Sequence, residues 1–398
     1  MRTQCCVVGG GPAGVFLALL LAQRGVEVVL LEQHGDFDRD FRGDTVHPAT
    51  LELLAEMGLV DAVLALPHGR LERMRVHAGD RSWQIADFSR LRTAYPYVAI
   101  IPQSRFLQCL VDHADALPTF SRRMGAGVVD VIEEGGRVAG VRYREGGEMR
   151  ELRADLVVAT DGRFSRLRRA VGAEIDVAAP PMDVAWARIP LGEEDAPGFH
   201  VAPGRLLVHF RRPDAIQFGY VFPRDGFTPL KTAGIDAFRA SVAEMIPAWK
   251  TRLESIESFE AVHLLRVQSD CLRRWYRDGL LLLGDAAHAF SPVGGVGINY
   301  AIGDAVEAAG MLLPSFRNGR PVPISALARV EARRRPLVRW VQRGQARMQR
   351  ILVEPALDRA RPFVLPWPMR SLLAVPGLRD LPARMIAFGP RRVRAPAP

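Results

Sequence analysis

The pattern of hydrophobic positions at the start of the chain predicts a strand, a turn, a helix and a second strand. Residues 3–8 form a short, mainly apolar run, which is typical of a strand buried in a parallel sheet. Glycines crowd positions 9–14, and an apolar helical segment follows over 15–23. Gly25 ends that helix, and residues 26–31 form a second apolar run closed by Glu32. This order predicts a β–α–β unit.

The later pattern predicts further strands and helices of an α/β protein. Helices are expected at 48–57 and 104–116, and alternating strands that meet at two Gly-Gly pairs predict a β-meander over 127–157. A buried strand is expected at 155–160. In the middle of the chain the pattern predicts strands at 183–189, 206–210 and 216–222, and helices at 235–247 and 250–260. A very apolar strand at 279–283, a helix at 298–313 and an arginine-rich helical segment to about 352 follow.

Composition places the chain among ordinary globular proteins. Of its 398 residues, 48% are hydrophobic and 24% are charged, which excludes a disordered, fibrous or disulfide-rich protein. The four cysteines are scattered without metal-binding spacing, so we expect no metal site and a reducing compartment. The apolar stretch 5–22 holds glycines that favour a strand–turn–helix over a signal or membrane segment. These features predict a cytoplasmic protein.

The positive charge is concentrated near the C-terminus. The net charge is +9, but from Arg320 onward there are 17 arginines and four acidic residues. A bias toward arginine codons explains the scarcity of lysine but not the shortage of acids, which hints at an anionic surface or partner. No nucleic-acid partner is expected, because the arginines lack interleaved aromatic residues and a known motif.

The first glycine cluster has the spacing of a dinucleotide-binding turn. Gly9-x-Gly11-x-x-Gly14, with Pro12 and Ala13 inside it, joins the first strand to the first helix. Glycines there let backbone amides approach a pyrophosphate at a helix N-terminus. Glu32 lies at the end of the second strand, where a carboxylate accepts hydrogen bonds from a ribose. The sequence therefore predicts an ADP-containing cofactor.

Two later motifs decide which cofactor is expected. Asp161-Gly162-x-x-Ser165-x-x-Arg168 follows an apolar strand. Gly284-Asp285-Ala286-Ala287-His288 follows another, and Pro292 and a glycine run to Asn299 open the next helix. Asp285 suits a sugar-alcohol chain, and amides at the helix N-terminus suit a negative charge on a reduced flavin ring.

In this order the three motifs resemble the FAD-dependent aromatic hydroxylases of the para-hydroxybenzoate hydroxylase type, the class A flavoprotein monooxygenases. The resemblance covers about residues 2–330 and implies FAD as cofactor with NADPH or NADH as a transient donor. It implies hydroxylation of an aromatic or similar electron-rich small molecule by O2 through a flavin C4a-hydroperoxide.

The resemblance also implies roles for single residues. Those assigned to the cofactor are Gly9, Gly11, Pro12, Ala13, Gly14, Glu32, Arg42, Gln103, Asp161, Gly162, Gly284, Asp285, Gly295, Gly297, Ile298 and Asn299. Pro292 is expected against the flavin ring. His47, in a loop near the reactive edge of the flavin, is a candidate base for a phenol, with a structural role as the alternative. His288 is expected to be structural, and His209, Gln217 and Tyr220 are candidate substrate contacts on the middle strands.

The resemblance implies a two-domain architecture. A glutathione-reductase-like FAD-binding Rossmann domain is expected to be interleaved with a smaller mixed β-sheet substrate domain, with a helical C-terminus. The expected divisions are 1–179 for the first part of the FAD-binding domain, 180–270 for the substrate domain, 271–330 for the second FAD part and 331–398 for the basic helical region. The chain is expected to be a monomer or a homodimer.

Three alternatives stay open at the level of the sequence. A flavin-dependent halogenase would need tryptophans where Ala185 and Ala187 stand, and Trp186 is out of that register. A membrane-surface hydroxylase or epoxidase of a quinone or isoprenoid is suggested by the basic, partly apolar C-terminal region. An escort protein that uses the FAD fold without catalysis is the third.

Overall fold

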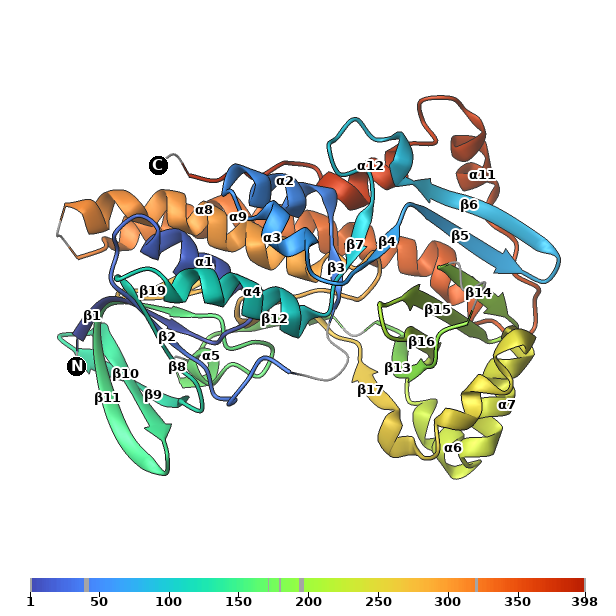
Figure 1. Ribbon diagram of the computed structural model, residues 1–398, viewed down its shortest axis with the longest axis horizontal. Coiled ribbons are helices and arrows are strands. Elements are labelled where there is room, and N and C mark those ends of the chain that lie inside the picture. Colours follow the sequence, from blue (N-terminus) through green and yellow to red (C-terminus); the bar gives the residue numbers. More distant parts are fainter. Residues whose placement is uncertain are drawn as a thin grey trace.

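Two large β-sheets lie at opposite ends of the molecule, and long helices run across the top of it (Figure 1). The computed structural model describes residues 2–38, 43–170, 172–178, 180–192, 197–318 and 321–396. The chain starts in the first sheet, enters the second sheet twice and returns to the first sheet each time. The expected mixed α/β fold with a helical C-terminal part is therefore confirmed.

The first sheet contains the predicted β–α–β unit. Its order is β19-β20-β11-β1-β2-β8, with β10 beside β11 and β9 beside β10. The pairs β1·β2, β1·β11, β2·β8 and β11·β20 are parallel, whereas β9, β10 and β11 form the predicted antiparallel meander. The strands are β1 (Arg2–Val8), β2 (Val28–Leu31), β8 (Phe120–Arg123), β9 (Gly127–Glu134), β10 (Arg137–Glu145), β11 (Glu148–Ala159), β19 (Tyr276–Arg277) and β20 (Leu280–Leu282). The last meander strand and the buried strand expected at 155–160 are one strand, β11.

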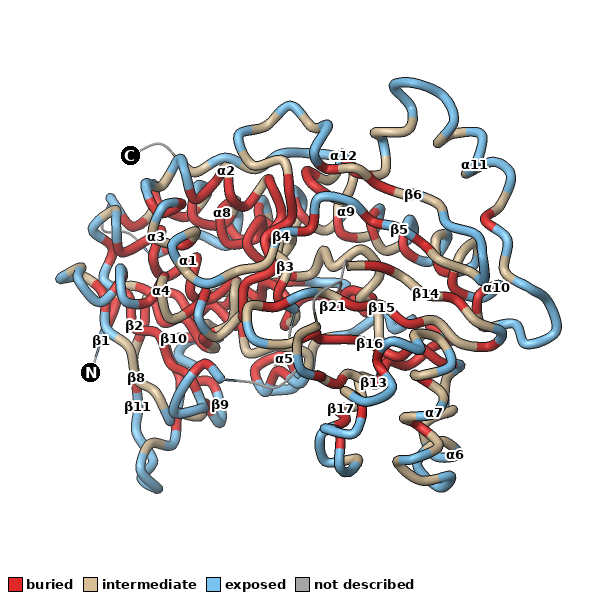
Figure 2. Tube along the Cα trace, turned by 45° about the vertical axis from the view of Figure 1, so that its right-hand side comes forward, coloured by how far each residue is buried: buried red, intermediate tan, exposed pale blue. Residues whose placement is uncertain are grey.

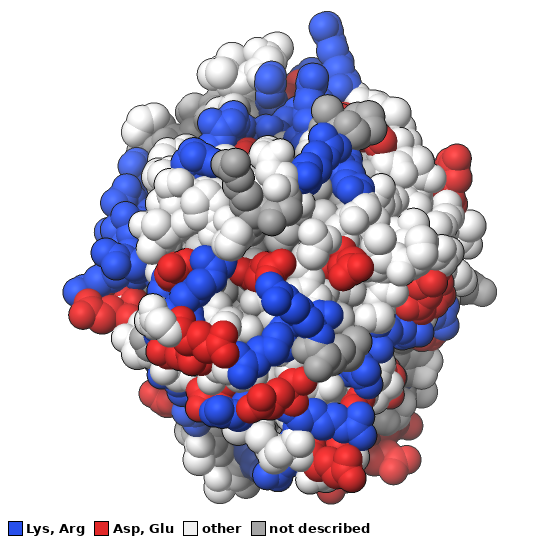
Figure 3. Space-filling view, turned by 90° about the vertical axis from the view of Figure 1, so that its left-hand side faces the viewer, with Lys and Arg blue, Asp and Glu red and all other residues white. Residues whose placement is uncertain are grey.

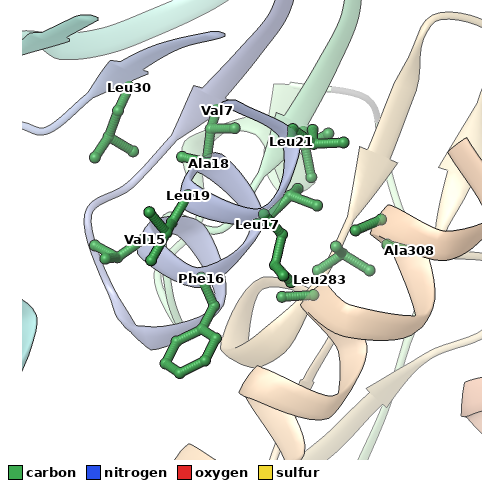
Figure 4. Packing of buried hydrophobic residues seen from close by; sticks show 14 of the residues in the cluster. Val7, Val15, Phe16, Leu17, Ala18, Leu19, Leu21, Leu30, Leu283 and Ala308 are labelled. Atoms are coloured by element: carbon green, nitrogen blue, oxygen red, sulfur yellow. The ribbon is translucent and has the colours of Figure 1, made fainter. Parts of the chain in front are cut away.

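Helix α1 (Pro12–Ala22) is buried along almost its whole length, which explains its apolar sequence. Figure 4 shows its side chains between Val7 and Leu30 of the sheet on one side and Ala308 of α8 (Gly297–Arg317) on the other. The stretch 5–22 thus lies in the centre of the core. Among the described residues, no helix combines the length and the apolar character that crossing a membrane requires.

The other predicted helices are present near their expected bounds. They are α2 (Pro48–Glu56), α4 (Gln103–Asp115) and α9 (Ile324–Met348), with the short helices α3 (Val60–Leu64) and α5 (Arg166–Ala170) between them. Helix α8 begins at the glycine run and packs on α1 and α9. Helix α9 continues into a π-helical turn (Gln349–Val353).

The second sheet has the order β17-β13-β16-β15-β14-β5-β6. Its strands are β5 (Arg73–Ala78), β6 (Arg81–Asp87), β13 (Met182–Ile189), β14 (Gly198–Ala202), β15 (Arg205–Arg211), β16 (Ile216–Pro223) and β17 (His263–Arg266). The predicted hairpin of β15 and β16 is confirmed. Strands β5 and β6 belong to this sheet although they fall within the range 1–179 expected for the first FAD part. The division of the chain into domains otherwise stays a prediction.

Helices α6 (Phe227–Thr232) and α7 (Ile235–Met245) accompany this second sheet, and α7 shares a core cluster with it. The helix predicted over 250–260 is wrong: two 3-10 turns, Arg252–Ser255 and Phe259–Ala261, take its place. Ile256 between them leaves the helical conformation, and its carbonyl accepts two hydrogen bonds from Arg239 of α7. A tertiary contact therefore overrides the helical pattern.

Two small sheets connect the large ones. One joins β3 (Thr45–Val46), β7 (Val98–Ile100) and β4 (Gly69–Leu71), and the other joins β12 (Ile175–Ala178), β18 (Ser269–Leu272) and β21 (His288–Ala289). The chain ends with α10 (Glu354–Ala356), α11 (Trp367–Ala374) and α12 (Leu381–Phe388). Figure 2 shows α11 as an exposed segment at the edge, whereas the red, buried trace fills the centre.

Part of the C-terminal positive charge is neutralised within the molecule. Arg334, Arg339 and Arg392 pair with Asp304, Asp176 and Glu52 from earlier segments. On the face in Figure 3, basic and acidic side chains are interspersed over its lower half rather than separated. These three ion pairs neutralise part of the charge excess within the molecule.

Candidate functional site

The first glycine motif forms a tight turn against β11. Gly9 has φ +106, which residues with a side chain rarely adopt, and a Cβ added there would lie 2.5 Å from the Thr160 carbonyl oxygen. A side-chain carbon added at Gly14 would overlap the Gly9 carbonyl oxygen. The Thr160 hydroxyl lies 2.8 Å from that same oxygen and 2.9 Å from the Val8 carbonyl, to which it donates. Gly9 and Gly14 are therefore required by the fold itself.

Gly11 is different, because no described atom lies within 4 Å of where its Cβ would be. It caps α1, and Pro12 follows in the first turn, where its missing N–H costs no hydrogen bond. Ala13 and Gly14 continue that turn. An open helix N-terminus at this end of a parallel sheet fits the approach of a pyrophosphate.

Glu32 lies beside this turn and is only 2% exposed. Its two carboxylate oxygens accept hydrogen bonds from the backbone amides of Gly10 at 2.6 Å and His34 at 2.9 Å. These bonds hold the carboxylate at the carboxyl end of β2, where the sequence predicts a ribose contact. Each oxygen can still accept a hydroxyl proton.

Arg168 of α5 fixes the turn that carries Asp285. Its guanidinium donates to the carbonyl oxygens of Ala286 at 2.8 Å and Asp285 at 3.2 Å. A buried ion pair with Asp270 neutralises that guanidinium. The Asp285 carboxylate is half-buried and pairs with Arg163 at 3.2 Å, so it is held in place but reachable. Gly284 precedes it at the end of the strand region.

Asp161 has two separate carboxylate environments. Oδ2 accepts hydrogen bonds from the backbone amide of Arg166 at 2.8 Å and, more weakly, from Leu167 at the start of α5. Oδ1 is buried without a hydrogen-bond partner among the described residues. Burial raises the pKa of this carboxyl group. Gly162 follows with φ +82, as the predicted turn requires.

His288 belongs to a buried network behind the Asp285 turn. Its Nε2 lies 2.6 Å from Asp304 of α8, which also accepts from the Gly284 amide at 3.1 Å. Arg334 of α9 donates to the other Asp304 oxygen at 2.6 Å. Burial by itself would raise the pKa of Asp304, but His288 and Arg334 together lower it by more. The pKa of this carboxyl group therefore lies below its usual range. The network ties α8 and α9 to the turn, which agrees with a structural role for His288.

The loop before α2 meets the glycine run before α8. The Thr45 hydroxyl donates to the Gly295 carbonyl at 2.9 Å, and the Gly295 amide donates to the Pro292 carbonyl at 3.0 Å. Ile298, next to Gly297 at the start of α8, lies against Gly43. These contacts set the spacing of two segments that are more than 240 positions apart in the sequence.

Asn299 joins the same two segments through its side chain. Its Oδ1 accepts hydrogen bonds from the His47 amide at 3.2 Å and from the Thr50 hydroxyl at 2.6 Å. Its Nδ2 is buried and has no partner among the described residues. A buried amide donor beside a glycine-rich helix N-terminus is an incomplete set of hydrogen bonds, which a polar ring edge would complete.

His47 does not face an open site with its Nδ1. That atom lies 2.8 Å from the Ile386 carbonyl of α12, and a bond to a carbonyl requires the proton on Nδ1. The side chain is 2% exposed, and burial lowers its pKa to about 4. The imidazole is therefore neutral at physiological pH and anchors the C-terminal helix to the α2 loop.

A buried ion pair connects that loop to the second sheet. The Asp44 carboxylate lies 2.6 Å from Arg212 at the end of β15, and both side chains are 8% exposed. Asp44 also accepts from the backbone amide of Gln103 at 3.2 Å, which places Gln103 at the start of α4 beside the loop. Arg212 donates to Gln217 at 2.9 Å. Burial raises the pKa of Asp44, and Arg212 is the largest opposing influence.

The three candidate substrate residues do not share one face of the second sheet. Tyr220 and His209 lie on the face covered by α7, where Tyr220 contacts Phe238 and His209 contacts Trp249. Gln217 is on the other face, three residues before Tyr220 and thus of opposite parity. Of these residues only Gln217 lies on the face opposite α7, where it binds Arg212, and substrate contact stays a prediction for all three. The alternation of the strands did not reveal which face is covered by helices.

The sequence analysis missed residues that the tertiary structure brings to the site. Asp44, Thr45 and Arg212 hold the loop, although Asp44 and Thr45 stand inside the segment whose His47 was singled out. Nothing in the sequence marked Arg212 as a site residue, because it follows a predicted strand, as many surface arginines do. Arg42, predicted near the pyrophosphate, lies outside the described residues.

The residues present fit an FAD at this position. Gly11 leaves an open approach at a helix N-terminus, and Asp161 Oδ1 and Asn299 Nδ2 are buried polar atoms without described partners. Asp285, which lies between Asp161 and Asn299 in the sequence, offers a carboxylate that Arg163 holds in place. These features lie along the carboxyl ends of β1, β2, β11 and β20, where ligands of open parallel sheets bind.

Comparison with known proteins identifies relatives along the whole chain. Residues 2–344 match the family described as FAD binding domain. The chain is 33% identical over 396 residues to 6-methylpretetramide 4-monooxygenase from Streptomyces rimosus, covering 99% of this chain and 94% of that protein. It is 27% identical over 333 residues to para-nitrophenol 4-monooxygenase from a Pseudomonas species, covering 79% and 78% of the two chains.

Solved structures show the same fold. The anhydrotetracycline hydroxylase OxyS from Streptomyces rimosus superposes with a TM-score of 0.75 at 26% identity, over 97% of this chain and 76% of that one. The Pseudomonas aeruginosa protein PqsL, in a complex with 2-aminobenzoylacetate, has a TM-score of 0.76 at 22% identity, over 90% and 98%.

Proposed function

Because the chain belongs to the FAD binding domain family and is an FAD-dependent monooxygenase, we propose that it uses NADPH or NADH and O2 to hydroxylate a phenolic aromatic molecule. The observation that carries this proposal is the convergence of three glycine-containing turns at the carboxyl ends of one parallel sheet, next to a second sheet. Bound FAD supplies the chemistry: it accepts a hydride equivalent from the nicotinamide and activates O2.

The residues of the chain bind and orient in this proposal. The Gly11 turn and the α1 N-terminus receive the pyrophosphate, Glu32 the ribose, and Asp285 a hydroxyl of the ribityl chain. Asp161, Gly162 and Gln103 lie on the adjoining segments. The amides at Gly297 and Ile298, with the Asn299 amide group, donate toward the pyrimidine edge, where a negative charge develops on reduction, and Gly295 shapes the turn before them. Pro292 forms the wall next to the ring.

Exclusion of water from the reacting edge is assigned to the loop and the C-terminal helix. Asp44, Thr45 and His47 each bind a different neighbour: Arg212, the Gly295 carbonyl and the Ile386 carbonyl. These bonds close the loop against the second sheet, the glycine run and α12. A neutral His47 with a pKa of about 4 is a weak base for a phenol, so we propose that it positions the loop.

The relatives support an aromatic, hydroxylated substrate. One is named for 6-methylpretetramide and another for para-nitrophenol, and both are named as monooxygenases. The first is similar over nearly the full length of both chains, which favours a phenolic polycyclic compound over a single-ring one. The chondrochloren halogenase also has this fold, but at 23% identity the likeness supports a shared fold and not a halogenase activity.

The decisive test is anaerobic stopped-flow reduction of the FAD-loaded enzyme by NADPH and by NADH, with and without a panel of phenols. Reduction that accelerates at least ~10-fold with one phenol, followed by a hydroxylated product after O2 is admitted, would support the proposal. Fast reduction that ignores every phenol and yields only hydrogen peroxide would contradict it. Binding to anionic liposomes at low and high salt tests the membrane-surface alternative separately.

A further inference from the structure

The face of the second sheet that looks toward the first sheet is built in cross-strand rows. One row runs from Phe199 through Val208, Gly219 and Trp186 to His263, because each is paired directly with the next. Directly paired residues point to the same face. Four of the five are half-buried, and Gly219 in the middle is buried. The row therefore presents a partly accessible, mainly apolar strip.

Trp186 occupies the centre of that strip because its cross-strand partner is a glycine. A side-chain carbon at Gly219 would lie 3.1 Å from both Cζ3 and Cη2 of the indole, and 2.9 Å from a methyl of Val184. The six-membered ring of Trp186 thus rests over Gly219. The absence of a side chain at Gly219 lets a large flat ring lie along the sheet.

The indole packs against a small apolar cluster that includes Val184, Val221 and Val353. Val293, in the loop that follows Pro292, packs against the same cluster. The neighbouring residues Ala185 and Ala187 point the other way, into the cluster with Phe218 and Trp249. Trp186, which the sequence placed out of register for a halogenase, is in register for the face opposite the helices.

The row next to this strip is polar. Gln217 lies on the same face, in the next row beside Phe210 and Arg188, and its Oε1 accepts from Arg212 at 2.9 Å and Arg188 at 3.3 Å. The face therefore offers a flat aromatic surface adjoining a polar, hydrogen-bonded group. That combination suits a planar molecule with a wide apolar body and oxygen substituents at one end.

We propose that the indole of Trp186 is the surface on which the ring system of the substrate stacks, and that it selects fused multi-ring phenols over single-ring phenols. The inference rests on the proposed function and names the substrate class of the same site. A fused ring system covers the whole indole, whereas one ring covers part of it, so more apolar area is removed from water with each added ring. Trp186 is a substrate-contacting residue in this proposal and takes no part in the chemistry.

The test compares 1,8-dihydroxyanthraquinone, with three fused rings, and 4-nitrophenol, with one. Dissociation constants are measured on the FAD-loaded enzyme without NADPH, by perturbation of the flavin spectrum, for the parent, W186F, W186A and G219A. W340A is the matched control, because Trp340 is 51% exposed on α9 and belongs to neither sheet. We expect W186A to weaken anthraquinone binding about 10- to 100-fold and 4-nitrophenol binding less than about 3-fold.

G219A is expected to act in the same direction, because its methyl group displaces the indole, and W186F is expected to retain part of the selectivity. The proposal is overturned if W186A and W186F bind the anthraquinone as tightly as the parent does, or if W186A weakens the binding of both phenols by the same factor. It is also overturned if the parent does not bind the anthraquinone. W186F carries the test if W186A loses its flavin. Selective binding without any hydroxylated product would uphold Trp186 while contradicting the proposed hydroxylation.

Discussion

The Asp44 carboxylate and the Arg212 guanidinium form a buried ion pair, 2.6 Å apart, between the loop before α2 and the end of β15. Both groups are almost wholly removed from water, and Gln103 and Gln217 provide further hydrogen bonds. A pair of this kind adds little stability compared with apolar side chains, but breaking it leaves a buried charge. It fixes where the loop lies relative to the second sheet.

Replacing Arg212 by Met is therefore expected to lower the free energy of unfolding by about 3–5 kcal/mol, because Asp44 loses its counter-charge. Chemical denaturation of the FAD-loaded protein measures this. The double variant D44N/R212M should recover part of the loss. R142M, which breaks the exposed Arg142–Glu151 pair, serves as the control and is expected to cost less than about 1 kcal/mol. Equal losses in R212M and R142M would refute the argument.

The first glycine motif contains two kinds of glycine, which substitution by alanine should separate. Gly14→Ala forces a methyl group onto the Gly9 carbonyl, so we expect a destabilised protein that accumulates poorly. Gly11→Ala meets no described atom and has φ −80, so the apoprotein should be as stable as the parent. We expect G11A to lose FAD affinity at least ~10-fold through obstruction of the pyrophosphate. Flavin content and thermal unfolding of the apoprotein measure the two effects, and a G11A protein with full flavin content would contradict the placement.

Asp285→Ala is expected to reduce FAD affinity about 10- to 100-fold, since a charge-assisted hydrogen bond to the ribityl chain is lost. The half-exposed Arg163 that pairs with Asp285 can turn to solvent, so the fold should persist. The ratio of flavin to protein absorbance after dialysis measures the effect. Asp278→Ala, which removes another ion-paired aspartate outside the motif, is the matched control. The role of Asp285 fails if both variants retain the same flavin.

His47 makes part of the stability dependent on pH. Burial lowers the pKa of His47 from 6.5 to about 4. Between these two pH values the folded protein therefore binds fewer protons than the unfolded chain. The stabilisation is complete above pH 6.5 and is lost as the pH falls toward 4, by about 3 kcal/mol for this group. His47→Gln should remove that share of the acid sensitivity, whereas the exposed His113→Gln should not. Denaturation at pH 7 and pH 4.5 tests this.

The same His47→Gln variant separates a positioning role from a catalytic one. If His47 is a base, the acid limb of the parent's pH–rate profile must disappear in the variant. We expect instead that the profile keeps its shape while the C-terminal helix is released, because the bond to Ile386 is weakened. Limited proteolysis near α12 reports that release. A pH–rate profile that changes while the proteolysis pattern does not would show that His47 acts as a base.

The sequence determined the first sheet and the cofactor because both depend on local pattern. A strand, three glycines at fixed spacing, a helix and Glu32 follow one another within 32 residues, so their geometry is set by neighbours along the chain. The motifs at Asp161 and Gly284 are short in the same way. Their meeting at one sheet edge follows from the parallel strands that precede them.

Only the tertiary structure decided the substrate side of the site. The sequence placed His209, Gln217 and Tyr220 on strands, but which of them lie on the face under α7 depends on a helix more than 25 residues from His209 along the chain. The segment 73–87 joins the second sheet by pairing with β14, more than 100 residues later. Arg212 meets Asp44, and Trp186 lies over Gly219, through contacts between distant segments. Such pairings leave no periodic signal in the sequence, because each is fixed by the packing of two surfaces rather than by the pattern of one.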